Sequence, residues 1–315
     1  MRLRVTLLIG VIAIMFATLD FSHIYHTLSS PSAGWLAAGL ALTVPQFLLS
    51  AWRWQLTAHA LKLSLPFSVA LKEYYLATVL NQILPGGIGG DITRAWRHSK
   101  DSDQKARAIH AVIIERLSGQ LALLTIGLIT LIAHPILLAP FDRLLHLPGI
   151  IIAPLAGSAV IIAAGLVWHF RTAAGHFLNN VRLSLLTREV WLQQLASSLI
   201  IVGTYIGVFA CCARALDSPL DNATLMALIP PILMAMVVPL SIGGWGVRES
   251  AAAVVWGIAG FSSSEGVAIS ILYGTLVLVS SLPGAVIFLM RRRSQRTSSN
   301  TRSNKTSLPR ANVRE

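Results

Sequence analysis

The sequence predicts an all-α polytopic membrane protein with about six full spans and two oppositely oriented re-entrant helical hairpins, arranged as an inverted-topology repeat. The chain is 54% hydrophobic and only 12% charged, whereas soluble domains carry roughly 25% charged residues. Several apolar stretches approach or exceed the ~18–20 residues that a bilayer core requires. Two further apolar stretches are broken by proline and glycine. The predicted spans are 3–19, 33–52, 113–133, 150–170, 190–212 and 267–290.

The first span follows Arg2 and Arg4, so it resembles a secretory signal. Its apolar stretch is longer than the roughly 7–15 residues of a cleaved signal, and no small-x-small cleavage site follows it. We therefore expect an anchor that remains in the membrane. Cys211 and Cys212 are neighbours in a predicted helix and point apart, which argues against a disulfide or a metal site.

The net charge of +12 is distributed as the positive-inside rule requires. With Arg2 and Arg4 placed in the cytoplasm, all Lys and Arg residues except Arg143, Arg214 and Arg248 border the cytoplasm. This pattern predicts a multi-pass protein of the cytoplasmic (inner) membrane with both termini in the cytoplasm. It also argues against nucleic acid as the partner of the basic residues.

The two broken stretches, 74–90 and 225–261, have flanks of opposite character. Basic clusters lie on both sides of the first stretch, so a full crossing would violate the charge rule. The second stretch has acidic residues near both ends and no cytoplasmic signal. We therefore expect one hairpin to enter from the cytoplasm and the other from outside.

An internal repeat supports this arrangement. The segment from Pro85 to Arg94 aligns without a gap with the segment from Pro239 to Arg248, and the two share Pro, Ile, Gly-Gly and Arg at the same positions. Chance alignment of common membrane glycines and prolines is the alternative. The repeat divides a transmembrane domain, 1–293, into halves of about 1–133 and 149–293. Residues 294–315 read as a disordered basic cytoplasmic tail.

The broken loops point to anion binding. Irregular backbone at membrane depth needs a protein or water-filled environment, and a helix that restarts after such a loop presents free N–H groups that suit phosphate. Arg94 and Arg248 follow each Gly-Gly at the same spacing and are expected to share that anion. Charged residues in membranes are costly and usually functional, although Asp91 and Glu115 are equally well explained as structural partners of the arginines. The candidate substrate-binding residues are Asn81, Gly86, Gly87, Gly89, Gly90, Asp91, Arg94, Glu115, Arg116, Gly243, Gly244, Arg248 and Glu249.

The remaining polar features give weaker indications of function. Arg53 lies between Trp52 and Trp54, which favours an interfacial anchor over a substrate contact. No catalytic, cofactor or metal motif is apparent, so we expect a protein that is not an enzyme and uses no cofactor. An intramembrane enzyme with two carboxylates stays a minor alternative.

The run from Asn81 to Arg94, together with Glu115-Arg116 and the segment from Ile242 to Glu249, resembles the lysylphosphatidylglycerol synthase transmembrane-region family, also described as flippase-like. The resemblance implies a membrane protein that moves or presents a lipid, such as an anionic phospholipid, a hopanoid-related lipid or a polyprenyl-phosphate lipid. The cytosolic domain that attaches the amino acid in the synthases is not recognisable after Arg293, so synthase activity is not expected. The expected function is lipid translocation. A non-transporting accessory protein that serves a glycosyl- or acyltransferase and a secondary transporter of a small anion are the alternatives.

Overall fold

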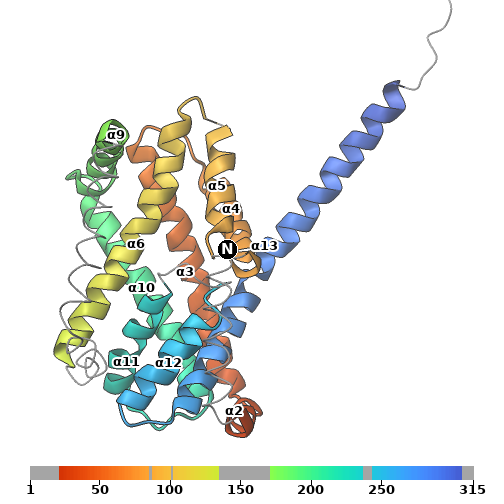
Figure 1. Ribbon diagram of the computed structural model, residues 1–315. Coiled ribbons are helices and arrows are strands. Elements are labelled where there is room, and N and C mark those ends of the chain that lie inside the picture. Colours follow the sequence, from red (N-terminus) through yellow and green to blue (C-terminus); the bar gives the residue numbers. More distant parts are fainter. Residues whose placement is uncertain (1–20, 85–86, 101, 135–170, 237–242, 307–315) are drawn as a thin grey trace, which may run out of the picture.

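The computed structural model describes residues 21–84, 87–100, 102–134, 171–236 and 243–306, and these residues form helices without any strand among them (Figure 1). Four of the helices are long and apolar enough to cross a membrane: α3 (Ala33–Ala60), α6 (Lys105–Ala133), α10 (Trp191–Ala215) and the Ser263–Arg291 part of α13 (Ser263–Thr306). They coincide with four of the predicted spans, which confirms a multi-pass membrane protein. The predicted spans 3–19 and 150–170 lie outside the described residues.

Between the long helices lie two pairs of short ones. The first pair is α4 (Phe67–Ile83) and α5 (Gly89–Lys100); the second is α11 (Asn222–Ala235) and α12 (Val247–Ile258). These helices have 17, 12, 14 and 12 residues, fewer than the ~20 that a bilayer crossing requires. Each pair packs together as a hairpin.

The turns of both hairpins use the predicted glycines. Gly87 has a φ of 64°, and Gly243 and Gly244 have φ values of 59° and 87°, a region that costs glycine little because it lacks a Cβ. The hairpins lie toward opposite ends of the bundle in Figure 1. Their turns meet, because a Cβ on Gly243 would lie only 3.2 Å from the Cα of Gln82 at the end of α4.

The packing of the two hairpins is reciprocal. The α4 helix packs along α13 and α11 packs along α6, while α5 contacts α6 and α12 contacts α13. Small residues allow these approaches: Gly284 of α13 lies against the Tyr75 carbonyl of α4, and Gly127 of α6 lies against Met234 of α11. Each hairpin is therefore held between one span from its own half of the sequence and one from the other half. The long helices α3 and α10 pack side by side between them.

Two larger apolar cores and a smaller one stabilise this frame. One contains Phe209, Trp256 and Tyr273 from α10, α12 and α13, and the other contains Trp54 and Leu61 with residues of α4 and α6. The smaller core joins Ile24 of α2 (Phe21–Leu28) to Val267 and Ala268 of α13. The helix α9 (Arg171–Val181) and a π-helical turn, η2 (Arg182–Leu186), pack against the core that contains Trp54.

The tail differs from the sequence-based expectation in its described part. The backbone of α13 continues as helix to Thr306, although the composition of residues 294–315 predicts disorder. A helix that is already nucleated in a span extends at the cost of only one residue per added hydrogen bond. Residues 307–315 lie outside the described part.

Candidate functional site

A buried carboxylate on α6 joins the first hairpin to the bundle. Glu115 accepts a hydrogen bond from Arg53 Nη2 of α3 at 2.7 Å on one oxygen, and one from Arg94 Nη2 of α5 at 2.8 Å on the other. The side chains of these three residues are 0–4% exposed. The other arm of Arg53 donates to Ser198 Oγ of α10 at 3.0 Å. One carboxylate therefore ties three helices together away from water.

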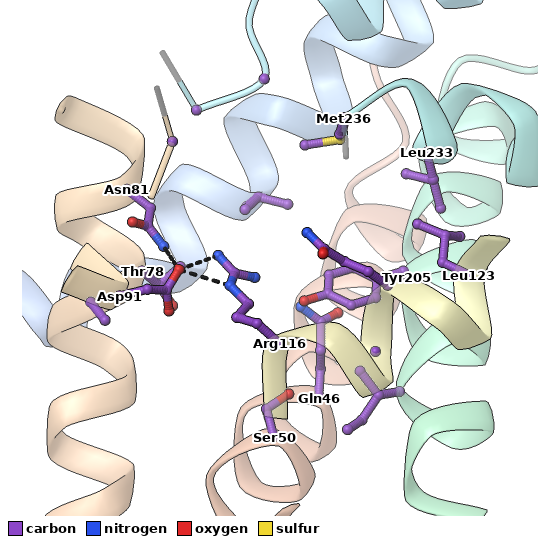
Figure 2. Close-up of a pocket in the computed structure, with 18 of the residues that line it drawn as sticks. Gln46, Ser50, Thr78, Asn81, Asp91, Arg116, Leu123, Tyr205, Leu233 and Met236 are labelled. Carbon is purple, nitrogen blue, oxygen red and sulfur yellow. Dashed lines mark hydrogen bonds and ion pairs between the residues drawn. The ribbon is translucent and has the colours of Figure 1, made fainter. Parts of the chain in front are cut away.

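A second carboxylate, Asp91 at the start of α5, lies beside the first. It pairs with Arg94 Nη2 at 3.0 Å. It also pairs with Arg116 Nη2 at 2.5 Å and accepts from Asn81 Nδ2 at 2.9 Å (Figure 2). The cluster made by Arg53, Asp91, Arg94, Glu115 and Arg116, called here the α3–α6 charge cluster, contains three guanidinium groups and two carboxylates. It therefore carries a surplus of one positive charge.

Arg94 occupies the interior of this cluster. Its guanidinium lies between the rings of Trp54 and Tyr74, with Cζ 4.5 Å and 4.6 Å from the two ring centres. Its side chain is 0% exposed. Cation–π contact and two ion pairs make Arg94 the residue that fixes α5 against α3, α4 and α6.

The second hairpin repeats this chemistry around Arg248. Its Nε donates to Ser270 Oγ of α13 at 2.9 Å, and its Nη2 pairs with Glu249 at 2.5 Å. The guanidinium again lies between a Trp and a Tyr, with Cζ 5.2 Å from the ring centres of both Trp245 and Tyr273. The pair of Arg248 and Glu249 is electrically neutral.

A cavity of about 240 Å³ lies where the hairpin turns meet. Residues from both turns and from α3, α6, α10 and α13 line it, and among them are the charged residues Arg53, Asp91, Arg116 and Arg248. Figure 2 shows Asn81 and Asp91 on one side of the cavity and Gln46 and Tyr205 on the other, with the Arg116 guanidinium between them. The neutral polar lining residues are Gln46, Ser50, Tyr74, Thr78, Asn81, Gln82, Gln120, Tyr205 and Tyr273.

Arg116 is the most accessible of these cations. Its side chain is 37% exposed, compared with 4% for Arg53 and 1% for Arg248. Its Nε and Nη2 both contact Asp91, while its remaining nitrogen, Nη1, has no hydrogen-bond partner within the described part of the chain. A guanidinium held in this way keeps donors available for an anion in the cavity.

The candidate residues chosen from the sequence fall into two groups. Those that line the cavity are Asn81, Gly87, Asp91, Arg116, Gly243, Gly244 and Arg248. Those that lie outside its lining are Gly89, Gly90, Arg94, Glu115 and Glu249, and Gly86 lies outside the described residues. The structure thus brings residues from both halves of the repeat to one cavity, and the arginines that line it include Arg116 and Arg248 but not Arg94.

One backbone N–H at the start of each second hairpin helix is satisfied within the hairpin. The Gly90 N–H of α5 donates to Asn81 Oδ1 at 2.7 Å, and the Gly246 N–H before α12 donates to Glu249 Oε2 at 2.6 Å. Each hairpin therefore caps its second helix with its own side chain.

Sequence reasoning missed the contribution of α3. The prediction that Arg53 is an interfacial anchor was wrong, because Arg53 is 3% exposed and bonded inside the bundle. A readable signal was present: Thr43, Gln46, Ser50, Arg53 and Thr57 recur at intervals of three or four within an apolar span, and all five are buried. This spacing places them on one helix face, so they form a polar stripe that faces α6 and α10.

One family of known membrane proteins matches most of this chain. The family model described as the lysylphosphatidylglycerol synthase TM region matches residues 1–284. A search of curated proteins finds no match. The match extends over both hairpins, the α3–α6 charge cluster and the cavity. The chain belongs to the lysylphosphatidylglycerol synthase transmembrane-region family.

Proposed function

We propose that this protein is a flippase-like lipid translocase that binds a phosphate-bearing headgroup in the cavity between the two hairpins. The observation that carries the proposal is the accessible, incompletely paired Arg116 in a charge cluster with a surplus positive charge. A phosphate near Arg116 would neutralise that surplus. It would also find two further guanidiniums, Arg53 and Arg248, in the wall. The family relationship supports a role in membrane lipid metabolism or transport.

The transport step requires access from both membrane faces, and the hairpins supply a route to it. We infer that α4–α5 and α11–α12 are re-entrant from opposite faces, within an inverted repeat of six spans. The reciprocal packing of α4 on α13 and of α11 on α6 supports this, as do the short helices and the meeting turns. Rocking of one half against the other would then expose a midplane site alternately to each side.

Cysteine labelling tests this topology. Ser64 and Asp103 flank the first hairpin, Ala223 and Ser262 flank the second, and all four residues are exposed. Single cysteines at Ser64 and Asp103 should react with a membrane-impermeant maleimide only from the cytoplasmic side, and those at Ala223 and Ser262 only from outside. The two native cysteines are buried, which keeps the background low. Labelling of the two flanks of one hairpin from different sides would refute re-entry.

Translocation itself is tested in liposomes that contain the purified full-length chain and fluorescent phospholipids. The accessible fraction of labelled headgroup after addition of an impermeant quencher measures the rate. Arg116→Gln should lower that rate by about tenfold to a hundredfold, because it removes charge-assisted hydrogen bonds to phosphate. The matched control is Arg107→Gln on the same helix, an exposed residue that donates to Gln104, and it should leave the rate unaltered.

The result also separates the alternatives. Headgroup binding without translocation, combined with co-purification of a glycosyl- or acyltransferase, would favour an accessory protein that presents a lipid. Uptake of a soluble anion driven by an ion gradient would favour a secondary transporter. Equal rates for protein-containing and protein-free liposomes, for every anionic or polyprenyl-phosphate lipid tried, would remove the translocase proposal.

A further inference from the structure

The cavity offers a bound headgroup two kinds of side chain, charged ones and neutral polar ones. Among the described residues that line it, the carboxylate is Asp91, which is occupied by Arg94, Arg116 and Asn81. The nearby Glu115, outside the lining, is occupied by Arg53 and Arg94. Glu249 of the second hairpin is likewise bound to Arg248, Ser270 and the Gly246 N–H. None of these three carboxylates is left to pair with an ammonium group.

Across from Asp91, the α3 wall presents two neutral polar side chains, Gln46 and Ser50, before the lining residue Arg53. Gln46 Oε1 and Ser50 Oγ are buried without a hydrogen-bond partner in the described part of the chain, and both residues line the cavity. Gln46 is 6% exposed and Ser50 is 1% exposed. They lie four residues apart on α3, one helical turn, so they present adjacent groups to the same space. Buried polar atoms are normally paired, so these groups call for a ligand or water with hydroxyl-type donors.

Taken together, the charges and the neutral wall define a headgroup. We propose that the cavity selects a net-anionic polyol phosphate, such as a glycerophosphate or sugar-phosphate headgroup, and discriminates against headgroups that carry an ammonium. The phosphate binds Arg116, and hydroxyl groups of the ligand bond Gln46 and Ser50. An ammonium in the same place would meet surplus positive charge and neutral partners only. This assignment of substrate class rests on the proposed headgroup site.

The experiment measures binding to the purified full-length protein in detergent, by tryptophan fluorescence or calorimetry, with three short-chain probes. They are dihexanoyl phosphatidylglycerol, which has a phosphate and hydroxyls; dihexanoyl phosphatidic acid, which has phosphate alone; and dihexanoyl phosphatidylethanolamine, which has an ammonium. We expect phosphatidylglycerol to bind at least about fivefold more tightly than phosphatidic acid and about tenfold more tightly than phosphatidylethanolamine. Equal affinity for phosphatidylglycerol and phosphatidic acid, or a preference for the ammonium probe, would overturn the proposal.

Variants on α3 sharpen the test. Gln46→Leu with Ser50→Ala should reduce the preference for phosphatidylglycerol over phosphatidic acid to about twofold or less. Gln46→Glu places a carboxylate in the cavity and should instead raise the affinity for phosphatidylethanolamine relative to phosphatidylglycerol. The exposed Thr125 of α6 provides the control, since Thr125→Ala lies outside the cavity lining and should preserve the preference. A preference that survives both α3 changes would contradict the role of this wall.

Binding of a soluble phosphate identifies the source of the headgroup, and the liposome assay tests translocation independently. If free glycerol 3-phosphate binds as tightly as dihexanoyl phosphatidylglycerol, the polyol-phosphate chemistry stands and its source is a soluble solute. Selective binding without translocation in liposomes would refute the translocase proposal and leave the selectivity intact. Translocation without selective binding would support the translocase proposal and refute the proposed selectivity.

Discussion

Replacement of Glu115 by glutamine should destabilise the protein strongly, because this carboxylate is the shared counter-charge of two buried arginines. Arg53 and Arg94 contact its two oxygens at 2.7 Å and 2.8 Å, with all three side chains at most 4% exposed. Removal of one partner from a buried ion pair costs about 3–5 kcal/mol, since the remaining charge is left without compensation. The glutamine amide in this position would retain one acceptor but would turn an N–H donor toward a guanidinium.

The measurement is equilibrium unfolding in mixed micelles together with the thermal midpoint. For domains of roughly 150–250 residues, 1 kcal/mol corresponds to about 2–4 °C, so Glu115→Gln should lower the midpoint by on the order of 10 °C. Arg94→Met removes one of the two arginines that depend on Glu115. The double variant should therefore be less destabilised than the sum of the single variants, with a coupling free energy of about 1–3 kcal/mol.

A matched control is available on the surface. Glu189 is exposed, so Glu189→Gln should alter the free energy of unfolding by less than about 0.5 kcal/mol. The reasoning would be refuted if Glu115→Gln fell within about 1 kcal/mol of the unmodified protein. Strict additivity of Glu115→Gln and Arg94→Met would refute it as well, because it would mean that the two side chains act independently.

Three further changes test other parts of the fold. Gly90→Ala should destabilise the first hairpin by about 1–3 kcal/mol in unfolding measurements, because a Cβ there would overlap the Ala77 carbonyl of α4. Glu73→Gln should cost only about 1 kcal/mol or less, because the arginines that pair with Glu73 are 29% and 42% exposed and their charges are screened. Hydrogen bonding from Thr224 holds the pKa of Asp221, the N-cap of α11, below its ordinary value. The stabilisation that Asp221 provides is therefore present at neutral pH and lost as the pH falls through that lowered pKa, so the thermal midpoint should become less sensitive to acid in Asp221→Asn.

Each of these changes has a contrary outcome. A Cβ at Gly175 would meet nothing within 4 Å, so Gly175→Ala is the control for Gly90→Ala, and equal effects of the two would contradict the close approach of α4 and α5. A loss at Glu73 as large as that at Glu115 would show that exposure does not set the strength of these pairs. An unaltered acid dependence in Asp221→Asn would remove Asp221 as the group that titrates.

The local features of the sequence determined much of this fold. Hydropathy identified four spans that the structure describes as long apolar helices, because the length of an apolar run is a property of the chain itself. Proline and glycine predicted where the broken stretches turn, and Gly87, Gly243 and Gly244 indeed adopt positive φ. The family relationship followed from short motifs of the same kind.

Tertiary structure alone decided which charges face the cavity. Arg94 and Arg116 are both near Asp91, yet aromatic rings from α3 and α4 enclose Arg94 while the side chain of Arg116 stays 37% exposed. Arg53 bonds Glu115, which is 62 residues away in the sequence, and Ser198, which is 145 residues away. Such pairings depend on how helices distant in sequence pack together, and the energies of buried charges follow from that packing and not from the residues on either side. The repeated Gly-Gly-x-x-x-Arg segments thus determined that two hairpins form, whereas packing determined that Arg116 presents the accessible charge between them.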